Sequence, residues 1–427
     1  MLDIKFIREN PDLVKKNIKK KFQDDKVKKV DELLEKENKY RELLQKSEKL
    51  RAERNKITSE INQLKKKEKD ISKLIKKAKD IPNKIKKSEE NISQLKKEII
   101  EIMLIIPNII SKETPKGKDE SQNKEIKKGG KIKKFDFPIK NHVEIIEKLG
   151  LADFDASARV SGNGFYYLKN ELALLNQALV RFTIEFMQKK GYEYIETPLM
   201  LNEKAIYASM SKEEIQDSVY SIKDEDLNLI GTAEQSLLAM HAGQIILEEK
   251  LPKKYFSYSM CFRKEIGSHG INEKGLWRTH QFNKVEQFIF CRPEESVKLY
   301  DELLKNSEEI LKVLELPYRI IEICSGDLAD WKYRSADLEV YRPTTKEYGE
   351  IMSLSNCTDY QARKLNIRFA DKQGNRKILH TLNDTALATS RIMVAIIENF
   401  QNKDGNVDIP KALQPYMNGI KKIKANK

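Results

Sequence analysis

The first third of the chain carries apolar residues at seven-residue intervals in an otherwise charged sequence. Between residues 27 and 64 the repeat is clearest at Leu43, Leu50, Ile57 and Leu64. Because residues seven apart lie on one face of a helix, this spacing predicts a long helix with a narrow apolar seam, as in a coiled coil. A helix over residues 27–64 would be roughly 57 Å long at about 1.5 Å per residue.

A second apolar stripe follows a short polar break. Residues 65–70 are all charged and interrupt the first seam. Two stripes of similar length with a short polar break between them predict an antiparallel helical hairpin, an arm over about residues 27–101. Pro82 falls inside the second stripe, where it should kink or restart the helix. The second stripe consists of Ile71, Leu74, Ala78, Ile85, Ile92 and Ile99, with Ile81 and Leu95 alongside.

The remainder of the chain has a different pattern. Residues 102–140 place proline and glycine among polar residues, which predicts a linker. From residue 141 to 427, strand-like and helix-like segments are mixed without regular alternation, which favours an α+β domain built on an antiparallel sheet flanked by helices. No Rossmann or P-loop glycine pattern occurs, which argues against both of those nucleotide sites. The expected strands are 192–195 and 287–290, and the expected helices are 170–190, 294–314 and 386–401.

Positive charge is concentrated in the N-terminal third. Residues 1–140 contain 41 Lys and Arg against 25 Asp and Glu, whereas the whole chain has 80 against 66. Such a surface suits a phosphate backbone or an anionic membrane, although a solvated lysine-rich helix would have the same composition. The N-terminus lacks a signal-peptide pattern, and no run of about 18 apolar residues occurs. We therefore expect a soluble cytoplasmic protein without membrane contact.

Cysteine and histidine do not form a metal-binding pattern. The four cysteines are widely spaced without a C-x-x-C pair, and no two of the five histidines are four residues apart. We expect reduced thiols, no disulfide framework and no zinc site. The cysteines are Cys261, Cys291, Cys324 and Cys357.

Charged and aromatic residues gather between positions 262 and 286. Two stretches show the i, i+2 spacing that places side chains on one face of a strand. Together they offer cations for a triphosphate, an aromatic ring for a purine and carboxylates for amino groups. Each residue alone could equally be part of an ordinary cross-strand pair. The residues are Arg263, Glu265, Arg278, His280, Phe282 and Glu286.

Residues 262–288 read FRKEIGSHGINEKGLWRTHQFNKVEQF, which resembles motif 2 of the class II aminoacyl-tRNA synthetases, specifically the seryl enzymes. GYEYIETPLM at 191–200 resembles the dimer-forming motif 1, and NDTALATSRIMVAIIENF at 383–400 resembles motif 3. Residues 231–234 are similar to the serine-binding element of that family, and residues 350–356 to its ATP and magnesium segment. The resemblance spans essentially the whole chain and implies serine activation by ATP followed by transfer to tRNA.

The resemblance also implies roles for individual residues. Arg263 and Arg391 would be catalytic, with Arg263 bridging the serine carboxylate and the α-phosphate. Arg391 with Phe282 would sandwich the adenine or hold the outer phosphates, and Glu350 and Ser353 would bind Mg²⁺. The implied serine-binding residues are Thr232, Ala233, Glu234, Arg263, Glu286 and Thr385. The implied ATP-binding residues are Arg263, Lys264, Glu265, Arg278, Thr279, Phe282, Glu350, Ile351, Met352, Ser353 and Arg391.

Some positions depart from the family pattern. Met352 and Asp384 stand where the family often has small residues, and residues 327–341 are more irregular than usual. A bulky Met352 next to Glu350 and Ser353 could crowd the phosphates. We expect both departing side chains to point away from the site.

The partners implied by the resemblance are L-serine, ATP, a second copy of the chain and tRNA(Ser), with tRNA(Sec) left open. Residues 1–101 would form the tRNA-binding domain. One alternative is a class II ligase for another acceptor. The other is a non-catalytic, synthetase-derived dimer that binds RNA, in which we would expect Arg263, Glu265 or Arg391 to be lost, yet all three are present.

Overall fold

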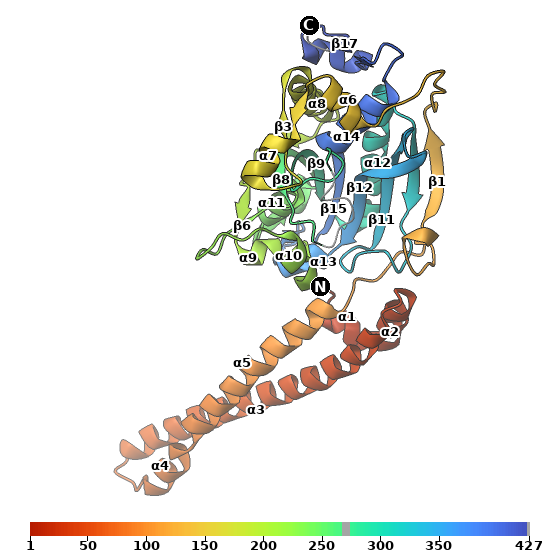
Figure 1. Cartoon of the computed structure of the whole chain (residues 1–427). Helices are drawn as coiled ribbons and strands as arrows, with labels where there is room; N and C mark the ends of the chain where they lie inside the picture. The colour runs from red at the N-terminus through yellow and green to blue at the C-terminus, as the bar shows by residue number, and fades with distance from the viewer. Residues whose placement is uncertain (267–273, 425–427) are drawn as a thin grey trace. The chain divides into compact units, whose positions relative to one another are not determined.

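The chain folds into two compact units, which contain residues Leu2–Pro107 and Asn108–Lys427. The computed structural model describes residues 1–266 and 274–424. Figure 1 shows the first unit as an arm of helices and the second as a large sheet with helices packed around it. None of the helices in the described part of the chain combines the length and apolar character that a membrane span requires.

Two long antiparallel helices form most of the first unit. Its helices are α1 (Ile4–Glu9), α2 (Pro11–Lys20), α3 (Val27–Lys65), α4 (Ser72–Lys79) and α5 (Ile81–Ile105). α3 and α5 pack along each other, and Ile57 of α3 is buried against Ile81 and Ile85 of α5. These residues belong to the two predicted stripes, so the predicted antiparallel coiled-coil arm is confirmed.

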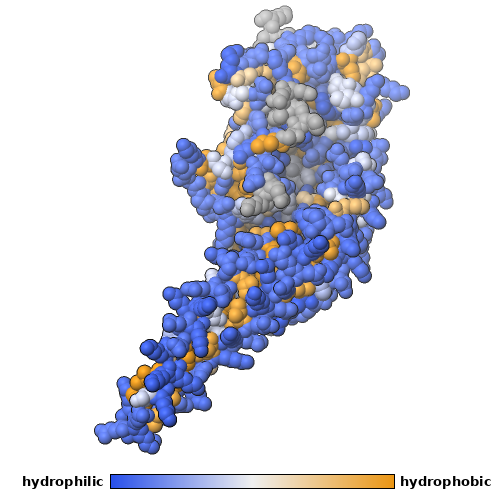
Figure 2. All heavy atoms as spheres, turned by 60° about the horizontal axis from the view of Figure 1, so that its bottom comes forward, coloured by the Kyte–Doolittle hydropathy of each residue, from blue (hydrophilic) through white to orange (hydrophobic). Residues whose placement is uncertain are grey.

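The helical hairpin turns where the sequence becomes most polar. Pro82 lies in the first turn of α5, where its missing N–H costs no hydrogen bond, so the helix restarts there. Exposed ion pairs join the two sides of the hairpin, for example Arg51 with Glu89 at 2.5 Å. Each such pair contributes little, about 0–1 kcal/mol, so the buried seam provides most of the stability. Hydrophilic residues cover most of the visible face of the arm (Figure 2).

An eight-stranded sheet forms the centre of the second unit. Its strands are β1 (Lys124–Gly129), β4 (Glu193–Tyr194), β8 (Lys253–Phe262), β9 (Gln281–Cys291), β10 (Tyr318–Glu322), β11 (Arg334–Arg342), β12 (Glu347–Thr358) and β15 (His380–Ala388). They stand in the order β1-β10-β11-β12-β15-β9-β8-β4. Every neighbouring pair is antiparallel except β8 with β4. The predicted α+β class is therefore confirmed.

Helices and short strands surround this sheet. The helices are α6 (His142–Lys148), α7 (Phe154–Ser161), α8 (Asn170–Lys189), α9 (Glu203–Ile206), α10 (Lys212–Ser218), α11 (Ala233–Ala239), α12 (Ser296–Val313), α13 (Tyr360–Lys364) and α14 (Thr389–Asn399). The short strands are β2 (Ala152–Asp153), β3 (Tyr167–Leu168), β5 (Met200–Leu201), β6 (Asn228–Leu229), β7 (Ile245–Leu247), β13 (Arg368–Ala370), β14 (Arg376–Ile378), β16 (Val407–Asp408) and β17 (Lys422–Ile423). The main hydrophobic core lies between the sheet and helices α8, α12 and α14.

The two faces of the sheet differ, as alternate residues of β9 show. The side chain of Gln287 donates hydrogen bonds to the Leu303 carbonyl at 3.4 Å and to Ser307 at 2.9 Å, both on α12. The adjacent Glu286 lines a polar cavity instead. Because neighbouring strand residues point to opposite faces, α12 covers one face and the cavity opens on the other.

Two sequence predictions differ from the structure. The segment 102–140 is not simply a linker, because its residues 124–129 form β1 and pair with β10. An edge strand with nearly all residues exposed lacks the apolar alternation that reveals a strand in sequence. The helix predicted at 386–401 begins only at Thr389, because residues 386–388 continue β15. A short apolar run fits either element, so its pattern could not fix the boundary.

Candidate active site

A cavity of about 330 Å³ opens on the face of the sheet opposite α12. Residues of β9, β12 and β15 line it, together with the starts of α11 and α14 and the segment after β8. This volume suits a small-molecule ligand. Most of the predicted site residues line it: Thr232, Glu234, Arg263, Glu265, Arg278, Thr279, Phe282, Glu286, Glu350, Ile351, Ser353, Thr385 and Arg391.

Two carboxyl groups, the buried one of Glu286 and the half-buried one of Glu234, lie at one end of the cavity. Glu286 accepts a hydrogen bond from Thr232 at 3.2 Å and pairs with Lys284 at 2.5 Å. Glu234 accepts from the amides of Gln361 at 2.7 Å and Asn383 at 3.0 Å. Burial, and then the nearby charge of Glu286, raise the pKa of Glu234 to about 7. A cationic ligand group beside Glu234 would favour its ionised form.

The start of α11 explains how these groups are held. Thr232 is the N-cap residue of α11, and its hydroxyl accepts a hydrogen bond from the backbone N–H of Glu234 at 3.2 Å. Ala233 occupies the first turn and is fully buried, so its side chain does not line the cavity. The cap therefore fixes Thr232 and Glu234 relative to each other, while Ala233 fills the core.

Arg263 lies between the carboxyl end and the aromatic wall of the cavity. Its Nε donates to the Gly231 carbonyl at 3.1 Å, and its guanidinium lies 5.4 Å from the centroid of the Phe282 ring. β8 ends at Phe262, so Arg263 and Glu265 are not on a strand face as the sequence predicted. Glu265 has φ +53°, a left-handed conformation that ends the strand geometry.

Arg391 is anchored at the other end of the cavity. It donates from Nη1 to the Glu350 carbonyl at 2.7 Å and from Nε to the Trp277 carbonyl at 3.2 Å, and it pairs with the Glu350 carboxylate at 3.3 Å. Its guanidinium lies 5.5 Å from the Trp277 ring centroid, whereas the cation over Phe282 is Arg263. The structure therefore does not bring Arg391 and Phe282 together directly.

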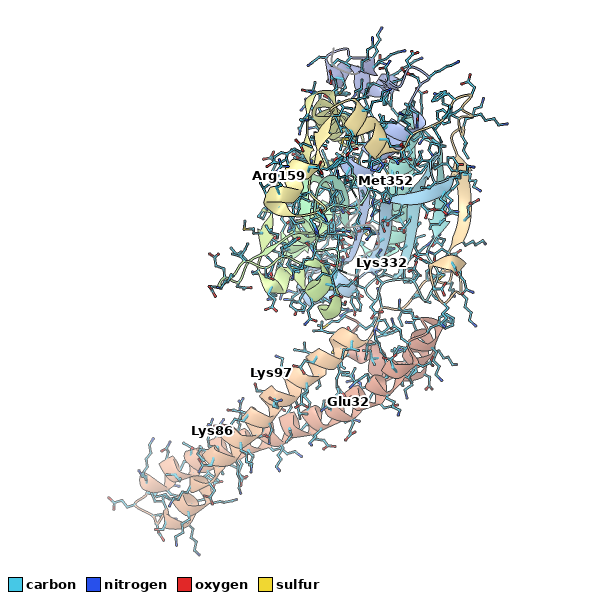
Figure 3. The ribbon with its side chains drawn as sticks, in the orientation of Figure 1. Glu32, Lys86, Lys97, Arg159, Lys332 and Met352 are labelled. Carbon is cyan, nitrogen blue, oxygen red and sulfur yellow. The ribbon has the colours of Figure 1, made fainter. Side chains whose placement is uncertain are left out.

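A β-bulge decides which residues of β12 face the cavity. Glu350 pairs with Glu339 and Met352 with Leu338, which leaves Ile351 as the extra residue. Glu350, Ile351 and Ser353 line the cavity, whereas Met352 is 1% exposed and lies in the core. The Met352 side chain therefore points away from the cavity, as expected, while its assignment as an ATP-binding position stays a prediction; Figure 3 labels this residue within the sheet.

Electrostatics differ between the acidic groups near this bulge. Burial alone would raise the pKa of Glu350, but Arg391 and Arg263 lower it overall. Burial and the Glu350 charge raise the pKa of Asp337, which pairs in register with Ser353. Glu350 is therefore ionised more readily than Asp337.

The remaining predicted positions lie outside the cavity lining. Lys264 contacts the Gln216 carbonyl at 3.5 Å and does not line the cavity. Asp384 accepts from Ser307 at 2.6 Å, on the side of α12, as expected for a side chain that points away. The middle of the motif 2 resemblance, residues 267–273, lies outside the described residues. Among the described residues, histidine, cysteine, aspartate and glutamate form no metal-binding group of three or more.

Several lining residues were missed by sequence reasoning. Lys284 could have been found, because it precedes Glu286 by two positions on the same strand and so shares its face. Trp277 lies between β8 and β9, and Trp331 and Lys332 lie in the connection between β10 and β11. No periodic pattern marks such loop residues, so only the fold could bring them to the cavity.

A mostly antiparallel sheet with arginines and carboxylates gathered over one face fits a class II aminoacyl-tRNA synthetase, and the family models show that class. The model of the tRNA synthetase class II core domain (G, H, P, S and T) matches residues 218–400, and that of the seryl-tRNA synthetase N-terminal domain matches residues 1–110. The serine–tRNA ligase of Methanospirillum hungatei is 43% identical over 98% of this chain and 99% of its own length. The chain therefore belongs to the seryl-tRNA synthetase family.

Solved structures agree over the whole chain. The crystal structure of the Pyrococcus horikoshii seryl-tRNA synthetase complexed with ATP has a TM-score of 0.95 and 42% identity, with 100% of both chains covered. The cytoplasmic serine–tRNA ligase of Naegleria fowleri in complex with AMP has a TM-score of 0.90 and 31% identity, with 100% of this chain and 99% of that one covered.

Proposed function

We propose that this protein activates L-serine with ATP to give seryl-adenylate and then transfers the seryl group to tRNA(Ser). The observation that carries the proposal is the cavity itself. It gathers in one space of about 330 Å³ the carboxyl group of Glu234, which would bind an ammonium group, Glu286 and Thr385, which would pair with a hydroxyl, and the cations Arg263 and Arg391.

Adenylation brings two anions together, the serine carboxylate and the α-phosphate of ATP. Positioning and charge neutralisation supply most of the catalysis for such a reaction. Arg263 is placed to contact both, because its planar guanidinium can donate several hydrogen bonds at once. Arg278 and Arg391 would bind the remaining phosphates from the far end. These roles are supported by the positions of the three arginines on the cavity lining.

Serine would be selected by its amino and hydroxyl groups. Glu234 with Thr232 would bind the ammonium group, and Glu286 with Thr385 would pair with the hydroxyl. Alanine would leave Glu286 and Thr385 unpaired, which commonly costs a factor of about 10⁴ in specificity. The hydrogen bond between Thr232 and Glu286 at 3.2 Å links the two subsites.

Mg²⁺ fits the oxygen atoms around the β12 bulge. Glu350 and Ser353 face the cavity, and Oδ1 of Asp337 is buried without a hydrogen-bond partner in the described part of the chain. Mg²⁺ is commonly held by one or two carboxylates together with substrate phosphates and water, so a larger protein cluster is not needed. Mg²⁺ bound by Glu350 and Ser353 would neutralise phosphate charge.

The N-terminal region would serve tRNA. We assign residues 1–101 as the tRNA-binding domain, because they contain 31 Lys and Arg against 20 Asp and Glu. Phosphate contacts along such a surface would follow an extended RNA helix. We also propose a homodimer through residues 191–200, with activity in the cytoplasm. Charging of tRNA(Sec) would need the same arm contacts.

ATP–pyrophosphate exchange with a panel of amino acids tests the function. Serine alone should sustain exchange, with threonine, alanine and glycine at background. Exchange with a different amino acid would favour another class II ligase. No exchange with any amino acid, in protein that binds tRNA, would favour the non-catalytic dimer. Sedimentation at micromolar concentration tests the homodimer, which a monomer would contradict.

A further inference from the structure

Lys332 is a cation of the cavity to which no role has been assigned. It lies in the connection between β10 and β11, and its side chain lines the cavity with Glu234 and Ser353. Its Nζ lies 3.2 Å from the Ser335 hydroxyl and 3.5 Å from the Ser353 hydroxyl. Figure 3 labels Lys332 in the sheet-containing unit. Two hydroxyls thus hold the ammonium group in place.

The charge of Lys332 is not neutralised by an ion pair. Among the described residues, five cations line the cavity, and three of them are paired: Arg278 with Glu265, Lys284 with Glu286 and Arg391 with Glu350. Lys332 and Arg263 make no ion pair with any carboxylate in the described ranges 1–266 and 274–424. An ammonium group donates three hydrogen bonds, so one donor of Lys332 is left after its two hydroxyl contacts.

Lys332 stands between the two ends of the cavity. Ser353, one of its hydroxyl contacts, belongs to the end proposed to hold phosphate and Mg²⁺. Glu234, at the end proposed to hold the serine ammonium, is close enough to be influenced by it. Burial and Glu286 raise the pKa of Glu234 to about 7, and Lys332 is among the groups that oppose this rise. The two reacting anions would meet between these ends.

We propose that Lys332 is a second cationic contact, beside Arg263, for the reacting anions, which are the carboxylate of the amino acid and the α-phosphate of ATP. This inference rests on the proposed function. A carboxylate oxygen forms a bond to the α-phosphorus, the bond from that phosphorus to the bridging oxygen breaks, and its electron pair leaves with pyrophosphate. Lys332 keeps its proton throughout and reduces the repulsion between the two anions.

The test compares variants that separate charge from shape. Lys332→Gln keeps a hydrogen-bond donor without the charge, Lys332→Ala removes both, and Lys332→Arg keeps the charge. Lys298→Met, at an exposed position on α12, is the matched control for loss of a lysine. Melting curves establish that each variant is folded.

Binding is measured separately from turnover. The two tryptophans of the chain, Trp277 and Trp331, both line the cavity, so their fluorescence should report ligand binding directly. The probes are L-serine, serinol, which lacks the carboxylate, and α,β-methylene-ATP, which cannot release pyrophosphate. Serine-dependent ATP–pyrophosphate exchange provides the rate.

Lys332→Gln and Lys332→Ala should weaken binding of L-serine or of α,β-methylene-ATP by about tenfold or more, the usual effect of losing a charged hydrogen bond. Serinol binding should change less than about twofold, and Lys332→Arg should restore most of the loss. A loss confined to L-serine identifies the carboxylate as the contact, and one confined to the ATP analogue identifies the phosphate.

The inference is overturned if both neutral variants bind the two anionic probes within about twofold of wild type and keep a comparable exchange rate. An equal loss of serinol binding would also overturn it, because serinol carries no anion. Absence of serine-dependent exchange in the wild-type protein would instead contradict the proposed function. The two failures are therefore distinguishable.

Discussion

Arg391 holds Glu350 at two points, with Nη1 donating to the backbone carbonyl at 2.7 Å and lying 3.3 Å from the carboxylate. This double contact ties the start of α14 to the bulged part of β12 across the cavity. Because a lysine has no planar fork, it cannot reproduce both contacts together with the Nε bond to Trp277.

Arg391→Lys should therefore act on ATP more than on serine. We expect kcat/KM for ATP to fall about a hundredfold and the KM for serine to change by less than about threefold. Steady-state pyrophosphate exchange measures both, and Arg376→Lys, an exposed position on β14, is the matched control. Equal losses for serine and ATP would mean that Arg391 supports the whole cavity.

Arg263→Ala should abolish adenylate formation while leaving the protein folded. Its guanidinium contacts the Gly231 carbonyl and the Phe282 ring on the cavity lining. We expect exchange to fall by about 10³-fold or more, with an unchanged melting curve. Exchange within about tenfold of the wild-type rate would remove Arg263 from the reaction.

Gly349→Ala should disturb the cavity by displacing the Trp277 side chain. An added Cβ would lie 2.3 Å from Cζ2 of Trp277, so the indole ring must move. Overpacking of this kind costs about 1–3 kcal/mol, which thermal or urea unfolding would detect. The KM for ATP should also rise, because the Trp277 carbonyl anchors Arg391.

The double variant Gly349→Ala with Trp277→Leu is the control for that prediction. A smaller side chain leaves room for the added methyl group. The double variant should therefore lose less stability than the sum of the losses in the two single variants. Additive losses would show that the two residues do not interact.

Serine binding should depend on pH through Glu234, whose pKa is raised to about 7. Below that pH the carboxyl is protonated and cannot pair with an ammonium group, so serine affinity should fall as the pH drops from 8 to about 5.5. Titrations of serine by fluorescence measure this dependence. Glu234→Gln should bind weakly at every pH, and a wild-type affinity that is constant over the range would contradict the assignment.

The Glu234 carboxyl group should also make the stability of the fold depend on pH. A carboxyl whose folded pKa is above its unfolded value of about 4.3 binds more protons when folded, so stability falls as the pH rises from about 4.3 to 7. Glu234→Gln should remove this slope. Urea unfolding at several pH values measures this slope, as the change with pH in the difference between the unfolding free energies of the variant and the wild type.

A shortened arm should separate activation from charging. Arg51 and Glu89 pair at 2.5 Å across the hairpin, so residues 52–88 can be replaced by a short glycine–serine turn without opening the rest of the seam. Serine-dependent exchange should stay within about twofold of wild type, and tRNA charging should collapse. Full charging by the shortened protein would assign the arm a structural role.

The affinity of the intact protein for tRNA should also depend on salt. Contacts made mainly to phosphates release counterions, so the logarithm of the binding constant should fall linearly with the logarithm of salt concentration. The shortened protein should show a smaller slope. Equal slopes would place the phosphate contacts outside residues 52–88.

Sequence predicted the features that depend on regular spacing. The seven-residue stripes led directly to the seam of Ile57, Ile81 and Ile85, because a helical period needs no knowledge of the rest of the fold. Most of the site residues that the motif resemblance implied line the cavity. The helical period is visible within a short stretch of sequence, and the motifs occur in a fixed order along the chain.

The missed features depend on contacts between distant segments. Met352 and Glu350 should share a face by simple alternation, but the bulge at Ile351 separates them. Lys332 reaches the cavity only because β11 and β12 are neighbours. Neither a single extra residue in a strand nor a loop position has a signature in one sequence.

The pairing of β1 with β10 sets an order of events during synthesis on the ribosome. α3 and α5 pack on each other and on α2 and α4, which are close in sequence, so the hairpin can form as soon as it emerges. Residues 124–129 must wait until residues 318–322 are made, at about 5–20 residues per second, before their partner exists. Until then their backbone groups are available to other chains, and Lys124, Lys127 and Lys128 provide the charge that discourages such intermolecular pairing.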